Sequence, residues 1–349
     1  MEGEAVRGFG FKAHGELSNL TMLDLPEPHA GPGQVRVAVK AAGLNHLDLF
    51  TLHGIEGIPI PLPHVMASDG SGVVDEVGTG VSRVKKGEKV LIDPNLSDGT
   101  CEYCKRGQEV LCRNYGIVGE HTNGMASDYA VLPAINVLKL PERLDFIQGA
   151  AAPLVFLTAW RALMVVGELK EGESVAIIGA GGGLVTAAIQ VAHWRGARVV
   201  VVTRSSAKGE KARKLGADDI VVPTAERPMG KALWEASQKK GFDLIFDSTG
   251  SATFSSSLKA VGRGGRLVFC GATTGPNVEV DLRSVFWRNM SIRGSTMSNH
   301  SEFYAVLKLL DEGKLNPVVD TAFPLEKGSE AMAKLSSGEF FGKIVLKVA

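Results

Sequence analysis

The stretch SVAIIGAGGGLVTAAIQVAHWRG, residues 174–196, decides the fold. A short apolar run leads into a glycine cluster, and apolar residues at helical spacing then continue to Gly196. A strand that ends in glycines and opens a helix begins a βαβ unit. The turn would let backbone N–H groups approach a pyrophosphate. It consists of Gly179, Gly181 and Gly182, and Gly183 and Leu184 follow at the helix start. A flexible loop is the alternative, and the βαβ context argues against it.

The same alternation continues on the C-terminal side of this unit. Further strands are expected over 197–203, 219–222, 242–250 and 265–272, with a helix over 206–217. Strands that alternate with helices indicate a doubly wound parallel sheet. Apolar residues over 149–166 predict a helix that enters this domain. Val185 stands where such glycine turns carry a packing glycine, so we expect a helix slightly displaced from its strand.

The remainder of the chain is β-rich. Residues up to about 155 carry short β-type runs between Gly and Pro, and 299–349 return to that texture. We therefore expect an α/β protein with a first domain over 1–155, a cofactor-binding domain over 156–298 and a return to the first domain over 299–349.

Charge and hydropathy exclude several classes. Lys plus Arg and Asp plus Glu both number 38 in 349 residues, whereas a nucleic-acid binder usually has a basic excess. No apolar run reaches the length of a membrane span, and the first residues lack a signal peptide's hydrophobic stretch. We expect a cytoplasmic protein that binds neither nucleic acid nor membrane.

The end of the second strand indicates which dinucleotide binds. NAD sites normally carry an acid there, but this chain has Thr203, Arg204 and Ser205, with Lys208 close by. Hydroxyls and basic groups can bind a 2′-phosphate, so the sequence predicts NADP(H). The alternative is that Arg204 and Lys208 form a solvated helix start.

Three clustered cysteines predict a metal site over 93–115. Four candidate ligands lie in one short segment: Asp98, Cys101, Cys104 and Cys112. Such a set suits a closed, structural, tetrahedral Zn²⁺ site. Three reduced thiols without metal are the alternative.

The chain resembles the zinc alcohol dehydrogenase type of the medium-chain dehydrogenase/reductase superfamily. Gly72, Gly78 and Val81 keep the skeleton of a family signature, and LKEGESVAIIGAGGG and GGRLVFCGATTG are also similar to that family. The resemblance implies a GroES-like β-rich catalytic domain with a cysteine lobe, a Rossmann domain and a β-rich return.

The resemblance also exposes missing catalytic ligands. Asn45, Ser68 and Leu154 stand where the family holds a catalytic zinc with Cys, His and Cys. Asp69 stands where the family has a neighbouring Glu. Leu47 and Phe50 stand where the family has the hydroxyl and the His of its proton relay. An amide, an alcohol and a leucine are poor zinc ligands, so we expect one zinc per chain at most, a structural one.

Hydrogen-bond donors must then stabilise the alkoxide that hydride transfer creates. Asn45 and Ser68 are the candidates, with His46, Asp48 and Asp69 as ionisable neighbours; alternatively, Asn45 and Ser68 merely fill the vacated site. The resemblance implies further cofactor contacts at Thr158, Cys270, Gly271, Ala272, Gly294, Ser295 and Lys343, the last with the cofactor phosphates.

The leading hypothesis is an NADPH-dependent reductase of bulky or aromatic ketones or aldehydes that works without catalytic zinc. Leu47, Phe50, Leu154 and Phe156 would form its apolar pocket. Reduction of an enone or quinone double bond is the second reading, and a catalytically silent NADPH-binding protein is the third. The resemblance places residues 289–298 at a subunit interface, which implies a homodimer or homotetramer.

Overall fold

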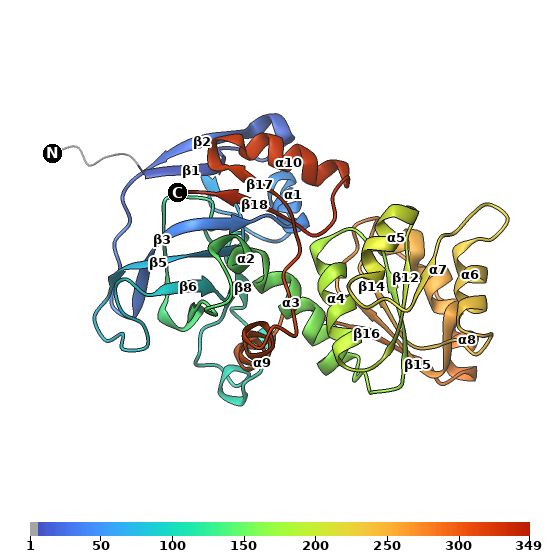
Figure 1. Cartoon of the computed structure of the whole chain (residues 1–349). Coiled ribbons are helices and arrows are strands. Elements are labelled where there is room, and N and C mark those ends of the chain that lie inside the picture. Colours follow the sequence, from blue (N-terminus) through green and yellow to red (C-terminus); the bar gives the residue numbers. More distant parts are fainter. Residues whose placement is uncertain (1–5) are drawn as a thin grey trace. The chain divides into compact units, whose positions relative to one another are not determined.

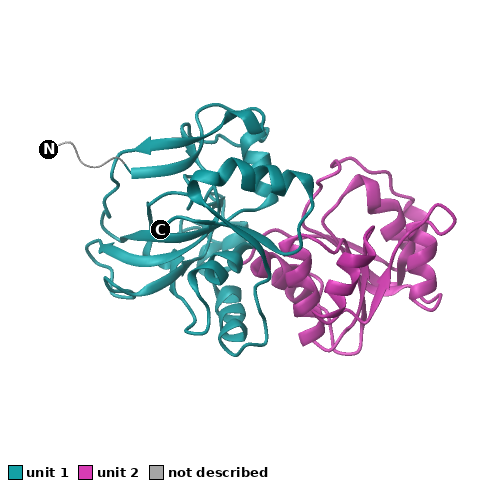
Figure 2. Ribbon diagram, turned by 45° about the horizontal axis from the view of Figure 1, so that its top comes forward, with its two compact units in different colours: residues 1–154, 299–349 teal, residues 155–298 magenta. Residues whose placement is uncertain are grey.

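The computed structural model describes residues 6–349 and divides the chain into two compact units (Figure 2). Unit 1 contains the residues up to Leu154 and Asn299–Ala349, and unit 2 contains Val155–Ser298. The expected boundary after residue 155 lies one residue from this division.

Unit 2 is built on a six-stranded sheet in which every pair of neighbouring strands is parallel (Figure 1). Its strand order is β13-β12-β11-β14-β15-β16. The strands are β11 (Ser174–Ile178), β12 (Arg198–Val202), β13 (Asp219–Val221), β14 (Phe242–Asp247), β15 (Val261–Phe269) and β16 (Ser291–Gly294). The helices are α3 (Pro153–Trp160), the π-helical η5 (Arg161–Val166), α4 (Gly183–Trp194), α5 (Ser206–Arg213), α6 (Met229–Ala236), α7 (Ser251–Ala260) and α8 (Leu282–Trp287).

The sheet is doubly wound, as expected. From β11 the chain winds through β12 to β13, and from β14 it winds the other way through β15 to β16. The point where the strand order reverses therefore lies between β11 and β14, and ligands of such sheets bind beyond the carboxyl ends of the strands there.

Unit 1 is β-rich. Its largest sheet has the order β10-β6-β5-β3-β18-β17, with β9 also paired to β3, and smaller sheets join β2-β1-β4 and β7-β8. The strands are β1 (Val6–Phe11), β2 (Leu20–Leu25), β3 (Gln34–Gly43), β4 (His64–Val65), β5 (Asp69–Val77), β6 (Lys89–Ile92), β7 (Asn95–Leu96), β8 (Gly116–Ile117), β9 (Tyr129–Pro133), β10 (Val137–Lys139), β17 (Val319–Pro324) and β18 (Lys343–Lys347). The α-helices are α1 (His46–His53), α2 (Phe146–Ala151), α9 (His300–Asp311) and α10 (Gly328–Ser337), and the 3₁₀ turns are η1 (Leu17–Asn19), η2 (Cys104–Arg106), η3 (Glu109–Leu111), η4 (Ala134–Asn136) and η6 (Leu325–Lys327).

The register of three adjacent strands brings distant residues together. On β3, Gly43 pairs with Asp69 of β5 on one side and with Val345 of β18 on the other. Lys343, two residues before Val345, therefore starts its strand beside the end of β3 and the start of β5.

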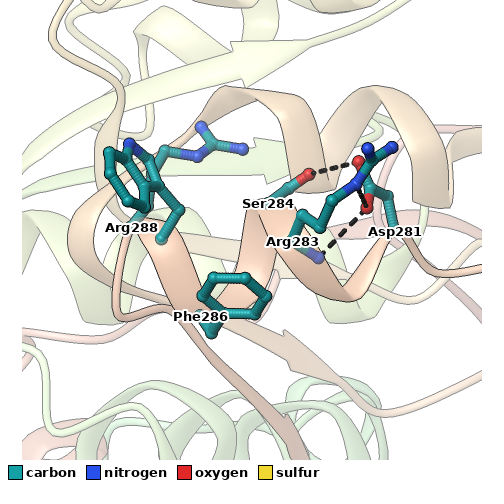
Figure 3. A pocket seen from close by; sticks show the side chains of 6 residues that line it. Asp281, Arg283, Ser284, Phe286 and Arg288 are labelled. Carbon is teal, nitrogen blue, oxygen red and sulfur yellow. Dashed lines mark hydrogen bonds and ion pairs between the residues drawn. The ribbon is translucent and has the colours of Figure 1, made fainter.

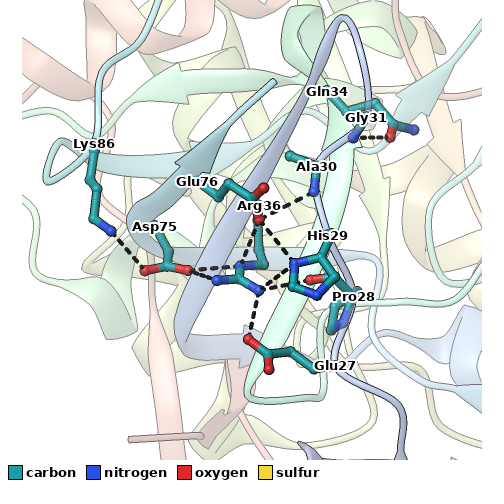
Figure 4. Close-up of polar contacts among 10 residues, drawn as sticks. All are labelled: Glu27, Pro28, His29, Ala30, Gly31, Gln34, Arg36, Asp75, Glu76 and Lys86. Carbon is teal, nitrogen blue, oxygen red and sulfur yellow. Dashed lines mark hydrogen bonds and ion pairs between the residues drawn. The ribbon is translucent and has the colours of Figure 1, made fainter. Parts of the chain in front are cut away.

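Arg36 contacts both strands that flank the first half of β3. Its Nε donates to Asp75 Oδ2 on β5 at 2.7 Å (Figure 4). Its guanidinium lies 5.0 Å from the ring centroid of Tyr129 on β9. It also donates to Glu27 Oε1 at 2.8 Å, which anchors the loop before β3.

Two expected helices are shorter than the sequence pattern. Pro153 interrupts the segment 149–166, because proline lacks the N–H that would continue α2 into α3. The helix expected over 206–217 ends at Arg213, and Gly216 follows with a φ of +107°. No helix among residues 6–349 is long and apolar enough to cross a membrane.

Candidate functional site

The glycine turn of unit 2 has the shape of an anion cradle. Gly179 follows β11 with a φ of +104°, and Gly182 caps the 12-residue helix α4. A Cβ added at Gly182 would meet no atom within 4 Å, so the space before the helix N-terminus is open. A dinucleotide's pyrophosphate fits there, because the first N–H groups of a helix lack intrahelical partners.

Val185 is accommodated without loss of this cradle. Its side chain is buried, and a Cβ at Gly179 would lie 3.4 Å from its Cγ2. The valine thus packs over the glycine that makes the turn.

The end of β12 contains no acid. Ser205 Oγ accepts a hydrogen bond from Lys208 N at 3.3 Å and caps α5, while Thr203 Oγ1 accepts from Ser205 N at 3.1 Å. The Arg204 side chain is exposed, and no ion pair is found for it within residues 6–349. A phosphate on the ribose would meet hydroxyls, a guanidinium and a helix N-terminus at this position.

The other expected cofactor contacts of unit 2 lie at its neighbouring strand ends and on α3. Phe269 of β15 pairs with Gly294 of β16, so the segment Cys270, Gly271 and Ala272 leaves the sheet beside Ser295. The Oγ of Ser295 is buried without a hydrogen-bond partner among the described residues. Thr158 is buried on α3, and its hydroxyl donates to Met297 Sδ at 3.6 Å. An unpaired hydroxyl at this edge suits a polar group of a bound ligand.

Unit 1 holds a buried polar cluster of Lys343, Asn45 and Asp69. The Lys343 ammonium donates to Asn45 Oδ1 at 2.6 Å and to Asp69 Oδ2 at 2.8 Å. Asn45 Nδ2 donates to the same Asp69 Oδ2 at 2.9 Å and to Gly43 O at 3.3 Å. The Lys343 and Asp69 side chains are 3% and 0% exposed. The expectation for Lys343 was a contact with the cofactor phosphates; in this structure its partners are an amide and a carboxylate of unit 1.

Asp48 organises the backbone around that cluster. Its two carboxylate oxygens accept hydrogen bonds from Asn45 N and Ala67 N, each at 2.7 Å. Burial raises its pKa to about 6, against those hydrogen bonds. Asp48 thereby fixes the start of α1 to the segment before β5. His46 lies on the exposed side of α1. Desolvation by neighbouring protein atoms and the charge of Lys343 lower its pKa.

The three positions that resemblance assigns to catalytic-zinc ligands converge in the fold. Asn45 bonds to Asp69 through its side chain, and Leu154 donates its backbone N–H to Asp69 Oδ1 at 2.7 Å. Ser68 precedes Asp69 directly, and its Oγ is buried without a partner among the described residues.

These residues do not fit a catalytic zinc. The cluster offers neither thiolate nor imidazole, and the Lys343 cation already neutralises its carboxylate. A divalent cation there would face a like charge at short range in a buried environment.

The expected pocket is only partly realised. Leu47 and Phe50 on α1 and Leu154 on α3 keep accessible surface, but Phe156 is 1% exposed. Phe156 is therefore buried in this structure.

The cysteine lobe brings its four candidate ligands together. One ligand atom from each of Asp98, Cys101, Cys104 and Cys112 lies within 4.8 Å of all the others. Asp98 Oδ1 accepts from the N–H groups of Thr100 and Cys101, and hydrogen bonds of this kind hold the pKa of Asp98 well below its usual range. Burial raises the pKa of Cys104 to about 12, so a metal that binds there must displace a proton. Three sulfurs and one carboxylate fit a closed Zn²⁺ site.

The sequence did not predict that Lys343 bonds to Asn45 and Asp69. A signal was present: a lone lysine starts the apolar strand IVL at residues 344–346, and a buried lysine requires an acidic partner.

Comparison with known proteins extends over both units. Family models for an alcohol dehydrogenase GroES-like domain and for a zinc-binding dehydrogenase match residues 31–142 and 183–312. An alcohol dehydrogenase of Geobacillus stearothermophilus is 32% identical over 94% of this chain and 96% of its own length. An acryloyl-coenzyme A reductase of Metallosphaera sedula is 30% identical over 95% of this chain and 97% of its own. The solved structure of an NAD-dependent alcohol dehydrogenase matches 98% of this chain and 100% of its own, with a TM-score of 0.94 and 41% identity.

Proposed function

Because the chain belongs to the zinc-type alcohol dehydrogenase-like medium-chain dehydrogenase/reductase superfamily, we propose that it is an NADP(H)-dependent reductase of bulky or aromatic ketones or aldehydes that works without catalytic zinc. Its oxidoreductase type follows from the family. The preference for NADP(H), the substrate class and the absence of a catalytic metal are proposals.

One observation carries the proposal. At the positions of the family's metal ligands, the chain has a buried cluster of hydrogen bonds around the Lys343 ammonium. A reduced nicotinamide, when bound, supplies the hydride. The chain must then stabilise negative charge on the carbonyl oxygen with N–H or O–H donors.

The exposed apolar surface of α1 supports a bulky substrate. Phe50 is 41% exposed although it is a large apolar side chain, and Leu47 lies one turn before it. Burial of such side chains against an aromatic or branched substrate is favourable by about 25 cal/mol for each Å² removed from water.

The cysteine lobe supports one structural Zn²⁺ per chain. None of the four cysteines forms a disulfide in the structure, so the three of the lobe are free to bind a metal. Clustered cysteines of this kind also support a cytoplasmic location.

A panel assay tests the proposal. NADPH and NADH oxidation would be followed with aromatic ketones, aliphatic ketones and aldehydes. We expect turnover with aryl ketones and a lower KM for NADPH. Equal KM values for the two cofactors would contradict the NADP(H) preference. Tight NADPH binding without turnover on any substrate would favour a silent binding protein.

Reduction of a conjugated double bond is the second candidate. The similarity to an acryloyl-coenzyme A reductase favours it, and this chemistry develops charge on the same type of oxygen. Enones, enoyl thioesters and quinones therefore belong in the panel, and faster turnover of these than of ketones would select this candidate.

A further inference from the structure

We infer that Lys343 is a catalytic residue whose ammonium takes over the role of the missing metal. On the proposed function, which this inference deepens, its N–H binds the carbonyl oxygen of the substrate and protonates it.

Asn45 and Asp48 have no donor to offer. Both N–H bonds of the Asn45 amide are used, one by Asp69 Oδ2 and one by Gly43 O. As a carboxylate, Asp48 accepts two backbone hydrogen bonds and donates none. The expectation that Asn45 serves as the donor to the substrate is therefore not supported by its hydrogen bonds.

Lys343 keeps one donor. An ammonium has three N–H bonds, of which two go to Asn45 Oδ1 and Asp69 Oδ2. No third partner is found for it in residues 6–349. Around this cluster, the hydroxyl of Ser68 is a second donor without a partner among the described residues.

The position of the cation makes the remaining N–H effective. The side chain is 3% exposed, so water screens its charge little, and Asp69 and Asn45 fix its direction. Asn45 and Asp69 are thus positioning residues for Lys343.

The reaction balances without a metal. Hydride adds to the carbonyl carbon and forms a C–H bond, and the π electrons of C=O move to oxygen. That oxygen takes a proton from Lys343, the N–H bond breaks, and an alcohol and a neutral amine result. The amine recovers a proton from solvent, so the sum is NADPH plus ketone plus H⁺ to NADP⁺ plus alcohol.

The experiment separates this role from a contact with the cofactor phosphates. Lys343→Met removes the charge, and Lys347→Met, an exposed lysine on the same strand, is the matched control. Lys343→Met/Asp69→Asn also removes the buried carboxylate that pairs with the ammonium, which protects against loss of fold. The readouts are NADPH dissociation constants by fluorescence, kcat with an aryl ketone, the isotope effect with 4-deuterated NADPH, and thermal melts.

For both Lys343 variants we expect kcat to fall by about 100-fold or more, because general acid catalysis contributes about 10²–10⁴. NADPH affinity should stay within about twofold, and the isotope effect should rise because hydride transfer becomes slower. Unchanged kcat in the folded double variant would overturn the inference. A weakened NADPH affinity with kcat retained at saturation would overturn it in favour of the phosphate contact. Wild-type protein inactive on every carbonyl would instead refute the proposed function, and the inference with it.

Discussion

Arg204 is the residue on which the proposed preference for NADP(H) rests. It is exposed at the end of β12, beside the N-terminus of α5. A charged hydrogen bond to a 2′-phosphate is worth about 1.5–3 kcal/mol, which corresponds to about a 10- to 100-fold change in binding. Arg204→Ala should raise the KM for NADPH by that factor and leave the KM for NADH within about twofold.

Lys214 at the far end of the same helix offers a control of equal charge. Lys214→Ala should change neither KM. If Arg204→Ala weakened NADPH and NADH equally, the residue would act on the helix and not on the phosphate.

Glu120 is a buried acid whose charge the fold does not compensate. It is 5% exposed, its nearest basic atom is His121 Nδ1 at 3.9 Å, and burial raises its pKa to about 7. The folded state therefore favours the protonated form. Its contribution to stability is fully present below the unfolded pKa, near 4.3, and is lost as pH rises through about 7.

Glu120→Gln should remove that pH dependence. At pH 8 the variant should be more stable than wild type by about 3–4 kcal/mol, and at pH 4 the two should be equal. Denaturant unfolding at both pH values measures the difference. A variant that is less stable than wild type at pH 8 would show that the carboxylate has a stabilising partner.

The composition of the site was largely predictable, but its hydrogen bonds were not. The resemblance to a known family assigned Asn45, Ser68, Asp69 and Leu154 to one site. The use of both Asn45 N–H bonds and the arrival of Lys343 depend on a strand nearly 300 residues further along the chain. Sequence patterns report local periodicity, whereas such a contact depends on the register of three strands.

Among the elements, the strand, glycine turn and helix that begin the βαβ unit were predictable, because their local sequence signals all pointed to the same structure. An apolar run, a left-handed glycine and an apolar helix together leave few alternatives. The break at Pro153 was missed because apolar periodicity continues through it, although proline removes a helical hydrogen bond.

The cysteine lobe is the element whose stability should depend on metal. Two short 3₁₀ turns, η2 and η3, hold its ligands, and the lobe has little regular structure of its own. Wild-type protein should hold one Zn²⁺ per chain by elemental analysis. Cys112→Ser should lose it and lower the melting temperature by roughly 5 °C or more, because a structural metal contributes directly to folding.

Cys270 supplies the matched control for that experiment. It lies beyond β15 in unit 2, outside the metal-ligand cluster, and burial raises the pKa of its thiol to about 12. Cys270→Ser should keep the zinc. Two tightly held zinc ions per chain in wild type would contradict both this prediction and the zinc-free mechanism.

At the scale of the whole molecule, the return of the chain to unit 1 completes the candidate site. After Ser298 the chain re-enters unit 1, where Asn299 Oδ1 accepts from Val110 N at 3.1 Å and His300 Nδ1 lies 2.6 Å from Asp93 Oδ2. The chain then reaches β17 and β18, and β18 carries Lys343 to β3. The strands β3, β5 and β18 of unit 1 must therefore be assembled before the cluster exists.

We propose that the chain self-associates, as the resemblance implies, and an apolar surface on unit 2 supports this proposal. Leu282, Phe286 and Trp287 on α8 are 70%, 64% and 70% exposed, and α8 lies just before the edge strand β16 in the chain. Phe286 and Trp287 line a pocket together with Asp281, Arg283, Ser284 and Arg288 (Figure 3). Large exposed apolar groups beside an unpaired sheet edge favour contact with a second copy of the chain.

The double change Phe286→Asp/Trp287→Ser should therefore dissociate the oligomer. Light scattering after gel filtration should give wild type a mass of two or four times the 37.0-kDa chain, and the variant a mass closer to one. Removal of two large apolar side chains from each copy, and the cost of desolvating a carboxylate on each, would outweigh the apolar gain of a symmetric interface. Trp234→Ser removes an exposed tryptophan from α6 and should leave the mass unchanged. A wild-type monomer at micromolar concentration would contradict the proposed self-association, and a variant with the wild-type mass would place the interface elsewhere.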